Sequence, residues 1–281
     1  MSRISIHETS LTLPQGFRTE DSSDILAIGD IHGMADHLAA ILDYADGRAP
    51  SACNRIVVFM GDLIDRGPQS LRALDLALSA HQRPNVSQVI GLAGNHENML
   101  RLSIARDKSR LVTSSAFEIW RANGGETVLQ EIMEITGSAQ DAESLEAFLE
   151  GPRAAWLAAL QSHYFSGNLL FVHAGIHPDT PPHQYLGQPW DVPLHNLDED
   201  YHWAWIREPF LEAVPTHGHH GYFVVHGHSP VGVGDVATTQ QQIGRFRLNL
   251  DGGSFATGIT RAAIIVGQHI TLLDCWQSEK A

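Results

Sequence analysis

Residues 56–67 read IVVFMGDLIDRG, and this stretch decides the fold. Its apolar run, 56–60, predicts a buried strand, and the charged side chains of Asp62, Asp65 and Arg66 follow at once. In open α/β sheets, ligands bind beyond the carboxyl ends of the strands, where side chains point into a crevice. Two carboxylates and a guanidinium this close together are costly to hold without a cation or a phosphate. The stretch therefore predicts an α/β sheet with a charged site at a strand end, organised around Asp62.

The same pattern, an apolar strand that runs into Gly-Asp or Gly-Asn, occurs twice more. Residues 25–33 read ILAIGDIHG and residues 89–97 read VIGLAGNHE. The step from Asp30 to Asp62 is 32 residues and the step from Asp62 to Asn95 is 33, about one strand-helix-strand unit each. Right-handed crossovers of that length place neighbouring strand ends at one edge of a sheet. We therefore expect these four side chains to converge: Asp30, His32, Asp62 and Asn95.

Hydrophobic periodicity predicts the remaining elements. Residues 1–23 are expected to be a loose lead-in with one edge strand, and 176–200 a long irregular loop. Helices are predicted at 34–46 and 68–81, and near 95–107, 113–123, 125–135, 143–149 and 153–163. Strands are predicted at 24–29, 55–60, 87–93, 169–175 and 222–226, followed by antiparallel strands at 244–250, 257–266 and 269–275.

Length and charge limit the architecture and the partners. A chain of 281 residues without a visible linker is predicted to be a single domain, 1–281, in which a helical insertion at about 98–165 forms a cap. The formal net charge of −14 opposes tracking along nucleic acid, whose affinity comes largely from Lys and Arg. Any phosphate chemistry must therefore be local.

Cysteine use and hydropathy predict the compartment. Seventeen histidines against two cysteines are typical of a reducing compartment and not of a disulfide scaffold. No apolar signal core and no apolar run long enough for a membrane span are visible. We expect a cytoplasmic protein without a membrane partner, and the oligomeric state stays open.

Side chains at the strand ends suggest a metal centre. The candidate ligands are Asp30, His32, Asp62, Asn95, His173 and His228. Mixed Asp, His and Asn ligands suit hard or borderline divalent ions, with Mn²⁺ as our first choice and Fe²⁺ or Zn²⁺ as alternatives. Two ions about 3.5–4 Å apart that share a carboxylate can clamp an in-line displacement at phosphorus. Asp62, on the middle strand, is predicted to be the bridge.

Further residues are predicted to serve catalysis and substrate binding. His96 is the candidate proton donor to a leaving alkoxide, and Asp65 would keep its imidazole charged. Arg66 and Arg207 offer planar forks for phosphate oxygens, and Asn95 is also assigned to substrate binding.

Each of these residues also has an ordinary structural interpretation. A single Asp or Asn at a strand end is usually a helix cap or a turn former, and His173 could be a core histidine. The histidines of 217–221 (HGHHG) are interpreted as a solvated loop without a metal role. Trp203, Trp205 and Tyr201 could stack an adenine, although packing is the preferred interpretation. Convergence of the whole set at strand ends is what favours a site.

Five blocks of the chain, in order, resemble the signature of the calcineurin-like metallophosphoesterase superfamily. They are GDIHG (29–33), GDLIDRG (61–67), GNHE (94–97), HAG (173–175) and GHSP (227–230). Within the superfamily they are similar to the phosphoprotein phosphatase branch that includes bacterial and phage serine/threonine phosphatases. Weaker similarity covers WxxNGG (120–125), WIREPF (205–210) and NLDGG (249–253), where Gly252 stands in place of a usual threonine.

The resemblance implies a fold and a division of roles. It implies an αββα four-layer sandwich of two mixed sheets flanked by helices. It also implies one metal on Asp30, His32 and Asp62, and a second on Asp62, Asn95, His173 and His228. His96 with Asp65 would form the acid pair, and Arg66 and Arg207 would hold the phosphate.

We predict a phosphatase with two metal ions that hydrolyses phosphomonoesters, foremost phosphoserine and phosphothreonine of proteins, by attack of a metal-bound hydroxide. The nearest alternative is a dinucleoside polyphosphate hydrolase of the diadenosine tetraphosphatase type. A nuclease fits the acidic chain poorly, and a binding module would be expected to lack ligands. A cysteine phosphatase is excluded, since neither Cys53 nor Cys275 is followed by Arg six positions later.

Overall fold

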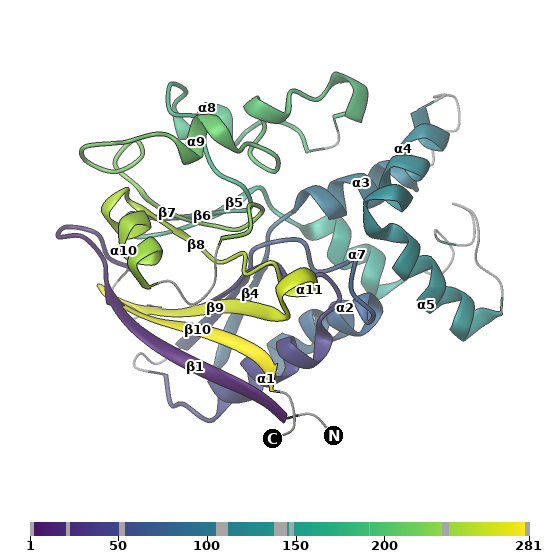
Figure 1. Cartoon of the computed structure of the whole chain (residues 1–281), viewed down its shortest axis with the longest axis horizontal. Coiled ribbons are helices and arrows are strands. Elements are labelled where there is room, and N and C mark those ends of the chain that lie inside the picture. Colours follow the sequence, from purple (N-terminus) through teal and green to yellow (C-terminus); the bar gives the residue numbers. More distant parts are fainter. Residues whose placement is uncertain are drawn as a thin grey trace.

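Two β-sheets packed face to face form the centre of the protein, and helices cover both outer faces (Figure 1). The computed structural model describes residues 3–20, 23–50, 54–104, 112–137, 145, 149–190, 192–231 and 236–278. All structural statements below refer to these residues.

The first sheet has the strand order β1-β10-β9-β2-β3-β4 in the described part of the chain. Its three neighbouring parallel strands are β2 (Ser23–Ile28), β3 (Asn54–Phe59) and β4 (Val86–Gly91). Helix α1 (Ala35–Asp46) connects the first two, and α2 (Ser70–Ser79) with the short η1 (Ala80–Gln82) connects the next two. The predicted pair of crossovers is confirmed, so three strand ends meet at one edge.

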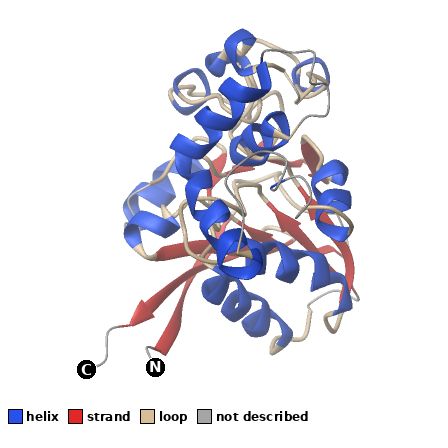
Figure 2. Ribbon diagram, turned by 90° about the vertical axis from the view of Figure 1, so that its right-hand side faces the viewer, coloured by secondary structure: helices blue, strands red, loops and turns tan. Residues whose placement is uncertain are grey.

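Strand β1 (Arg3–Thr12) forms the outer edge of this sheet. It pairs antiparallel with β10 (His269–Ser278) from Arg3 opposite Ser278 to Thr12 opposite His269, and β10 pairs with β9 (Ile259–Val266). The edge strand predicted in the lead-in is therefore confirmed, but it is longer and better paired than a loose segment. The two ends of the described chain lie side by side (Figure 2).

The second sheet has the order β5-β6-β7-β8 among the described residues. These strands are β5 (His163–Ser166), β6 (Leu169–Val172), β7 (Phe223–His226) and β8 (Arg247–Asn249). The prediction of an antiparallel strand at 244–250 is wrong, because β8 runs parallel to β7. A parallel pair needs a crossover, and the unpredicted helix α10 (Val236–Gly244) provides it.

Alternation along the strands divides the core. Ile25 and Ala27 of β2 face the second sheet, whereas Leu26 and Ile28 belong to the cluster that includes α1. Helices α8 (Pro182–Tyr185) and α9 (Glu208–Leu211) lie over the outer face of the second sheet (Figure 1). The layers are therefore helix, sheet, sheet and helix, and the expected αββα sandwich is confirmed.

The predicted helical block follows β4. It contains α3 (Asn95–Ser103), α4 (Val112–Trp120), the π-helical turn η2 (Arg121–Gly125), α5 (Glu126–Thr136) and α7 (Pro152–Ala159). The break predicted at 123–125 is present, since Gly124 has a φ of 120°. The helix predicted at 153–163 ends early because β5 begins at His163, and the helix predicted at 143–149 lies mostly outside the described residues.

Helices α5 and α7 contact α2 at the side of the first sheet. Glu131 of α5 accepts the backbone N–H groups of Ser70 (2.6 Å) and Leu71 (3.1 Å), which caps the start of α2. That the block serves as a cap within one domain of 281 residues stays a prediction.

The segment 176–200 is irregular, as predicted, apart from short turns of helix. These are α8, η3 (Leu194–Asn196) and η4 (Glu199–Tyr201), and α11 (Ser254–Thr257) is a similar single turn near β9. None of the described helices combines the length and the apolar character that crossing a bilayer requires.

Candidate metal centre

The predicted ligands follow strand ends of both sheets, and three of the six have strained backbone. Eight non-glycine residues of the described chain have positive φ, and five of them are predicted site residues: His32, Asp62, Asp65, Arg66 and His228. Such conformations are costly and persist only where the surroundings enforce them. They cluster here because the chain must turn sharply after the strand ends to aim polar side chains at one centre.

Asp62 lies between two groups of ligand atoms. Its Oδ2 is 3.6 Å from His32 Nε2, and its Oδ1 is 3.5 Å from His173 Nε2. The described residues contain two groups in which all ligand atoms lie within 4.8 Å of one another. One group is His32, Asp62 and His96, and the other is Asp62, His173 and His228. Asp62 is the member common to both, which is the arrangement that a bridging carboxylate requires.

Hydrogen bonds to the backbone fix which imidazole nitrogen is free. His32 Nδ1 lies 2.9 Å from the carbonyl of Ile64, and His173 Nδ1 lies 2.8 Å from that of Met60, so both present Nε2 to the centre. Such bonds orient ligating histidines in metal proteins. In His228 the roles are reversed, because Nε2 lies 3.0 Å from the carbonyl of Trp205 and Nδ1 faces the site.

Asn95 and Asp30 complete the predicted set from two other positions. Asn95 Oδ1 lies 2.9 Å from His228 Nδ1 and 3.2 Å from His173 Nε2. Asp30 is buried beside them and accepts the backbone N–H of His228 at 3.0 and 3.3 Å. Asp30 belongs to neither ligand group, however, and the group with His32 and Asp62 includes His96.

The electrostatics of the centre suit a cation. Burial lowers the pKa of His32 to about 3, and it also lowers the pKa of His173 and His228, so these imidazoles are neutral and able to ligate. Burial and the carboxylates of Asp251 and Asp62 raise the pKa of Asp30 well above its usual range. Several buried carboxylates in one place are relieved by positive charge. The residues therefore fit a pair of divalent ions.

Glu97 holds the turn that carries Asp62. Its Oε2 accepts the N–H groups of Asp62 (2.8 Å) and Gly94 (3.0 Å), and its Oε1 accepts that of Leu63 (2.8 Å). The Asp62 carboxylate in turn accepts the N–H of His96 at 3.0 Å. One buried carboxylate therefore ties the end of β3 to the start of α3. Sequence analysis gave Glu97 no role, although it stands in the GNHE block.

His96 and Asp65 are in contact, as predicted for an acid pair. His96 Nδ1 lies 2.7 Å from Asp65 Oδ2, and both side chains are fully buried. The indole N–H of Trp120 donates to both Asp65 oxygens, at 3.0 and 2.9 Å. His96 Nε2 is buried and has no hydrogen-bond partner among the described residues. That nitrogen is therefore not engaged within the described part of the chain.

The charge of His96 is set by two carboxylates. Burial acts against the imidazolium, but Asp62 and the hydrogen-bonded Asp65 outweigh it, so the pKa of His96 is raised. His96 therefore stays protonated to a higher pH than an ordinary histidine. Sequence analysis missed Trp120, which orients Asp65. Two signals could have indicated its role: a buried Trp usually finds a hydrogen-bond partner, and the WxxNGG block that contains it was visible.

The two predicted phosphate ligands differ in their surroundings. The Arg66 guanidinium lies over the ring of Phe255 at 4.9 Å, and its Nη1 is 3.0 Å from His32 Nε2. Arg207 is exposed at the start of α9. Burial and His173 are the larger causes of the lowered pKa of His228, and the charge of Arg207 lowers it further. Arg207 therefore acts on the same centre. The half-exposed Phe255 had no signal in the sequence.

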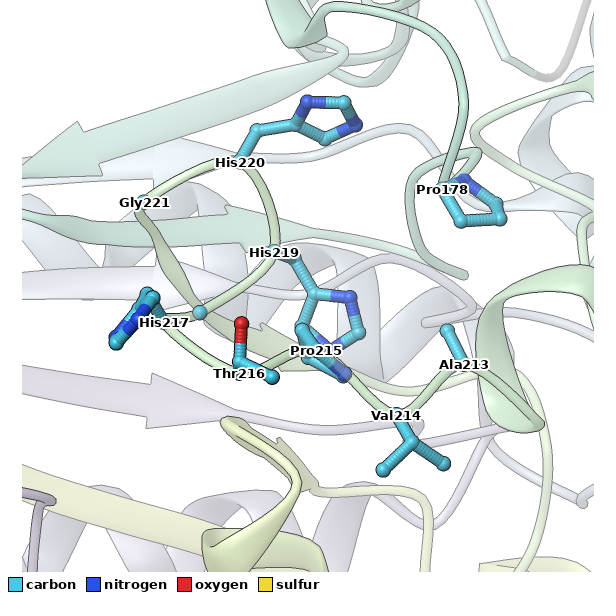
Figure 3. Close-up of a pocket in the computed structure, with 10 residues that line it drawn as sticks. Pro178, Ala213, Val214, Pro215, Thr216, His217, His219, His220 and Gly221 are labelled. Atoms are coloured by element: carbon cyan, nitrogen blue, oxygen red, sulfur yellow. The ribbon is translucent and has the colours of Figure 1, made fainter.

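The histidines of 217–221 lie apart from this set. They line a cavity of about 440 Å³ with Pro178 and residues 213–216, and their imidazoles point in different directions (Figure 3). Neither ligand group found among the described residues includes them. The interpretation as a wholly solvated loop is wrong for His219, which is 3% exposed and whose Nε2 lies 3.0 Å from the carbonyl of Arg245.

Comparison with known proteins identifies the family. Residues 23–253 match the calcineurin-like phosphoesterases, and this range contains the centre described above. The chain belongs to the calcineurin-like phosphoesterase family.

Curated relatives of this family member match with moderate identity. The asymmetrical bis(5'-nucleosyl)-tetraphosphatase PrpE of Bacillus velezensis is 29% identical over 157 residues, which cover 54% of this chain and 56% of that protein. The protein of the same name from Oceanobacillus iheyensis is 25% identical over 214 residues, 73% of this chain and 76% of the relative. The chain spans about half the length of the first curated relatives that it matches.

Solved structures support the same fold. A protein serine/threonine phosphatase from Saccharomyces cerevisiae superposes with a TM-score of 0.55. The superposition covers 92% of this chain and 81% of the yeast chain. Its sequence identity is 12%, so the likeness concerns the fold alone.

Proposed function

We propose that this phosphoesterase hydrolyses phosphoesters with two divalent metal ions. The observation that carries the proposal is the Asp62 carboxylate, whose two oxygens face His32 on one side and His173 on the other at 3.6 and 3.5 Å. A carboxylate so placed serves two cations at once, and the family binds divalent metals at a dinuclear site. Mn²⁺ is the proposed ion, with Fe²⁺ or Zn²⁺ as alternatives, because the donors are imidazole, carboxylate and amide.

The ligands divide as the family resemblance implies. Asp30, His32 and Asp62 would hold one ion, and Asp62, Asn95, His173 and His228 the other. Bound ions of this kind activate water and neutralise charge on the phosphoryl oxygens.

The chain's own residues supply the remaining steps. Arg66, Arg207 and Asn95 would orient the phosphoryl group. His96, held by Asp65 at 2.7 Å, would donate the proton from its free Nε2 to the leaving oxygen.

Phosphoserine and phosphothreonine of proteins are our first candidate substrates, in a cytoplasmic setting. A dinucleoside tetraphosphate is the second candidate, and a specific finding favours it, since the curated relatives quoted above are named bis(5'-nucleosyl)-tetraphosphatases. Both candidates use the same centre and differ only in the group attached to the phosphate.

A substrate panel with metal analysis of the same sample tests the proposal. We expect about two metal ions per chain, and turnover that is lost with a chelator and restored by Mn²⁺. A phosphothreonine peptide and diadenosine tetraphosphate are compared by kcat/KM. Full turnover by a metal-free sample, or no turnover of any phosphoester by the metal-loaded protein, would contradict the proposal.

A further inference from the structure

A second cavity, of about 360 Å³, opens between the helical block and the irregular segment 194–205. Six of its ten lining residues are apolar or aromatic, and the others carry polar side chains: Met99, Ala116, Ile119, Leu194, Leu197 and Trp205, with Ser115, Asn123, His195 and Glu199. Apolar walls with a few polar groups are typical of small-molecule sites, which range from about 300 to 1,000 Å³. This volume is near the lower limit and suits a small group.

Three walls of this cavity lead directly into the metal centre. The ring of Trp205 lies 6.4 Å from that of His228, and its carbonyl is 3.0 Å from His228 Nε2. Met99 lies one helical turn beyond His96 on α3. Asn123 adjoins Gly124, whose carbonyl accepts the N–H of Arg66. The cavity therefore adjoins residues of the metal centre, beside a group attached to a phosphate bound there.

The wall that contains Trp205 is preorganised. The Trp205 indole donates to Asn98 Oδ1 at 3.2 Å, and Asn98 Nδ2 donates to the carbonyl of Trp190. The Arg101 guanidinium lies over the Trp190 ring at 4.1 Å. Helix α3 thus holds Trp205 in place before a ligand binds. Binding against this wall therefore costs little side-chain entropy.

Charge and shape select the occupant. Glu199 lines the cavity, and Asp198 and Asp200 adjoin it, so a second phosphate group would be repelled. A neutral group is favoured. A flat heteroaromatic ring can stack on Trp205 and form hydrogen bonds with the polar residues at its edge.

We infer that this cavity, the base pocket, receives the nucleobase of a nucleotide whose phosphate lies in the metal centre. The inference rests on the proposed phosphoesterase function and names the substrate class of that site. An extended phosphopeptide would instead rely on contacts outside so small a pocket.

The variant Ile119→Asp tests the base pocket. Ile119 lines the pocket but is 41% exposed on α4, so a carboxylate there changes the pocket without opening the core. Ile135→Asp is the matched control, because Ile135 is 65% exposed on α5 and does not line the pocket. Each Mn²⁺-loaded protein is assayed with adenosine 5'-monophosphate and with ribose 5-phosphate, two phosphomonoesters that differ only in the nucleobase.

We expect Ile119→Asp to raise KM about tenfold or more for adenosine 5'-monophosphate, and to leave kcat/KM for ribose 5-phosphate within about twofold. The control should change neither. An equal change for both compounds, or a raised KM only for a phosphothreonine peptide, would overturn the inference.

Binding of adenosine itself separates this inference from the proposed function. Adenosine carries no phosphate, and equilibrium dialysis measures its binding without turnover. Wild type is expected to bind it and Ile119→Asp to bind it at least about tenfold more weakly. Failure of wild type to bind adenosine overturns the base pocket even if phosphoesters are hydrolysed, whereas adenosine binding without any hydrolysis overturns the proposed function alone.

Discussion

Histidines gather in two parts of this molecule, at the strand ends and in the loop 217–221, and the two groups differ in what surrounds them. At the strand ends, Asp62 lies 3.6 Å from His32 Nε2 and 3.5 Å from His173 Nε2. In the loop, the buried His219 instead has its Nε2 3.0 Å from a backbone carbonyl.

The difference shows that several histidines close together are not sufficient for a metal site. What makes one is a shared carboxylate, together with backbone carbonyls that hold one nitrogen of each imidazole and leave the other free. In the loop, backbone carbonyls also hold His219 Nε2 and His220 Nε2, but no ligand group with a shared carboxylate among the described residues includes these histidines, whereas the histidines from distant strands have both features.

Asp62→Asn should have the largest effect, because a neutral amide cannot serve two cations as a carboxylate does. We expect loss of both metal ions and a loss of activity of at least about a thousandfold, measured by metal analysis and kcat on one sample. His220→Asn, in the loop, is the control and should keep both properties. Two tightly bound ions in Asp62→Asn would contradict the bridging role.

His96→Asn should keep the metal and slow turnover by about 10²–10⁴-fold, the usual worth of a positioned general acid. The loss should be greatest for alkyl phosphates, whose leaving oxygen needs a proton, and small for 4-nitrophenyl phosphate. This variant also tests the ligand group in which His96 appears with His32 and Asp62. Loss of an ion would make His96 a ligand, and an equal slowing of both substrates would exclude proton donation.

His219 should give the loop a dependence on pH. Burial lowers the pKa of His219 from 6.5 to about 4, so the native state resists its protonation. The stability that the neutral ring contributes is present above pH 6.5 and is lost as the pH falls from 6.5 through about 4. At about 1.4 kcal/mol per pKa unit, the loss approaches about 3 kcal/mol.

His219→Gln should flatten that part of the curve of unfolding free energy against pH, measured by denaturant titration. His217→Gln, in the same loop, is the comparison variant. If wild type and His219→Gln lose stability in parallel between pH 6.5 and 4, the buried imidazole is not responsible.

Glu97→Gln should have the smallest effect of the four. The amide retains one oxygen, but its NH₂ faces backbone N–H groups that the carboxylate accepted, and an unsatisfied buried donor costs about 1–3 kcal/mol. We expect a lower free energy of unfolding by about that amount, with Glu134→Gln on the exposed face of α5 as the control. Unchanged stability would mean that the turn at Asp62 does not depend on Glu97.

The sequence alone was sufficient to predict the three parallel strands and the residues at their ends. The apolar run before Asp62, and its repeats before Asp30 and Asn95, predicted three parallel strands because each signal is local and the crossover rule fixes their order. The contact between His96 and Asp65 was predicted as well, and it is present at 2.7 Å.

The rest depends on contacts between distant segments. Nothing local distinguishes Arg247–Asn249 as a parallel strand, because its partner β7 and its covering helix α10 decide that. In the same way, Phe255 meets His32 and Arg66 only when α11 is brought to the centre. The buried ring of His219 packs against Phe210 and contacts the carbonyl of Arg245, which lies 26 residues further along the chain.

The hydrogen bonds from Trp120 to Asp65 have a consequence for how this scaffold can vary. The strand ends supply the ligands, but the group that aims the acid pair comes from the helical block after β4. A graft that exchanged only α4 to α5, residues 112–136, would retain the predicted metal ligands and His96 while it changed the group that orients Asp65. We therefore expect that metal affinity and leaving-group preference can change independently in this chain.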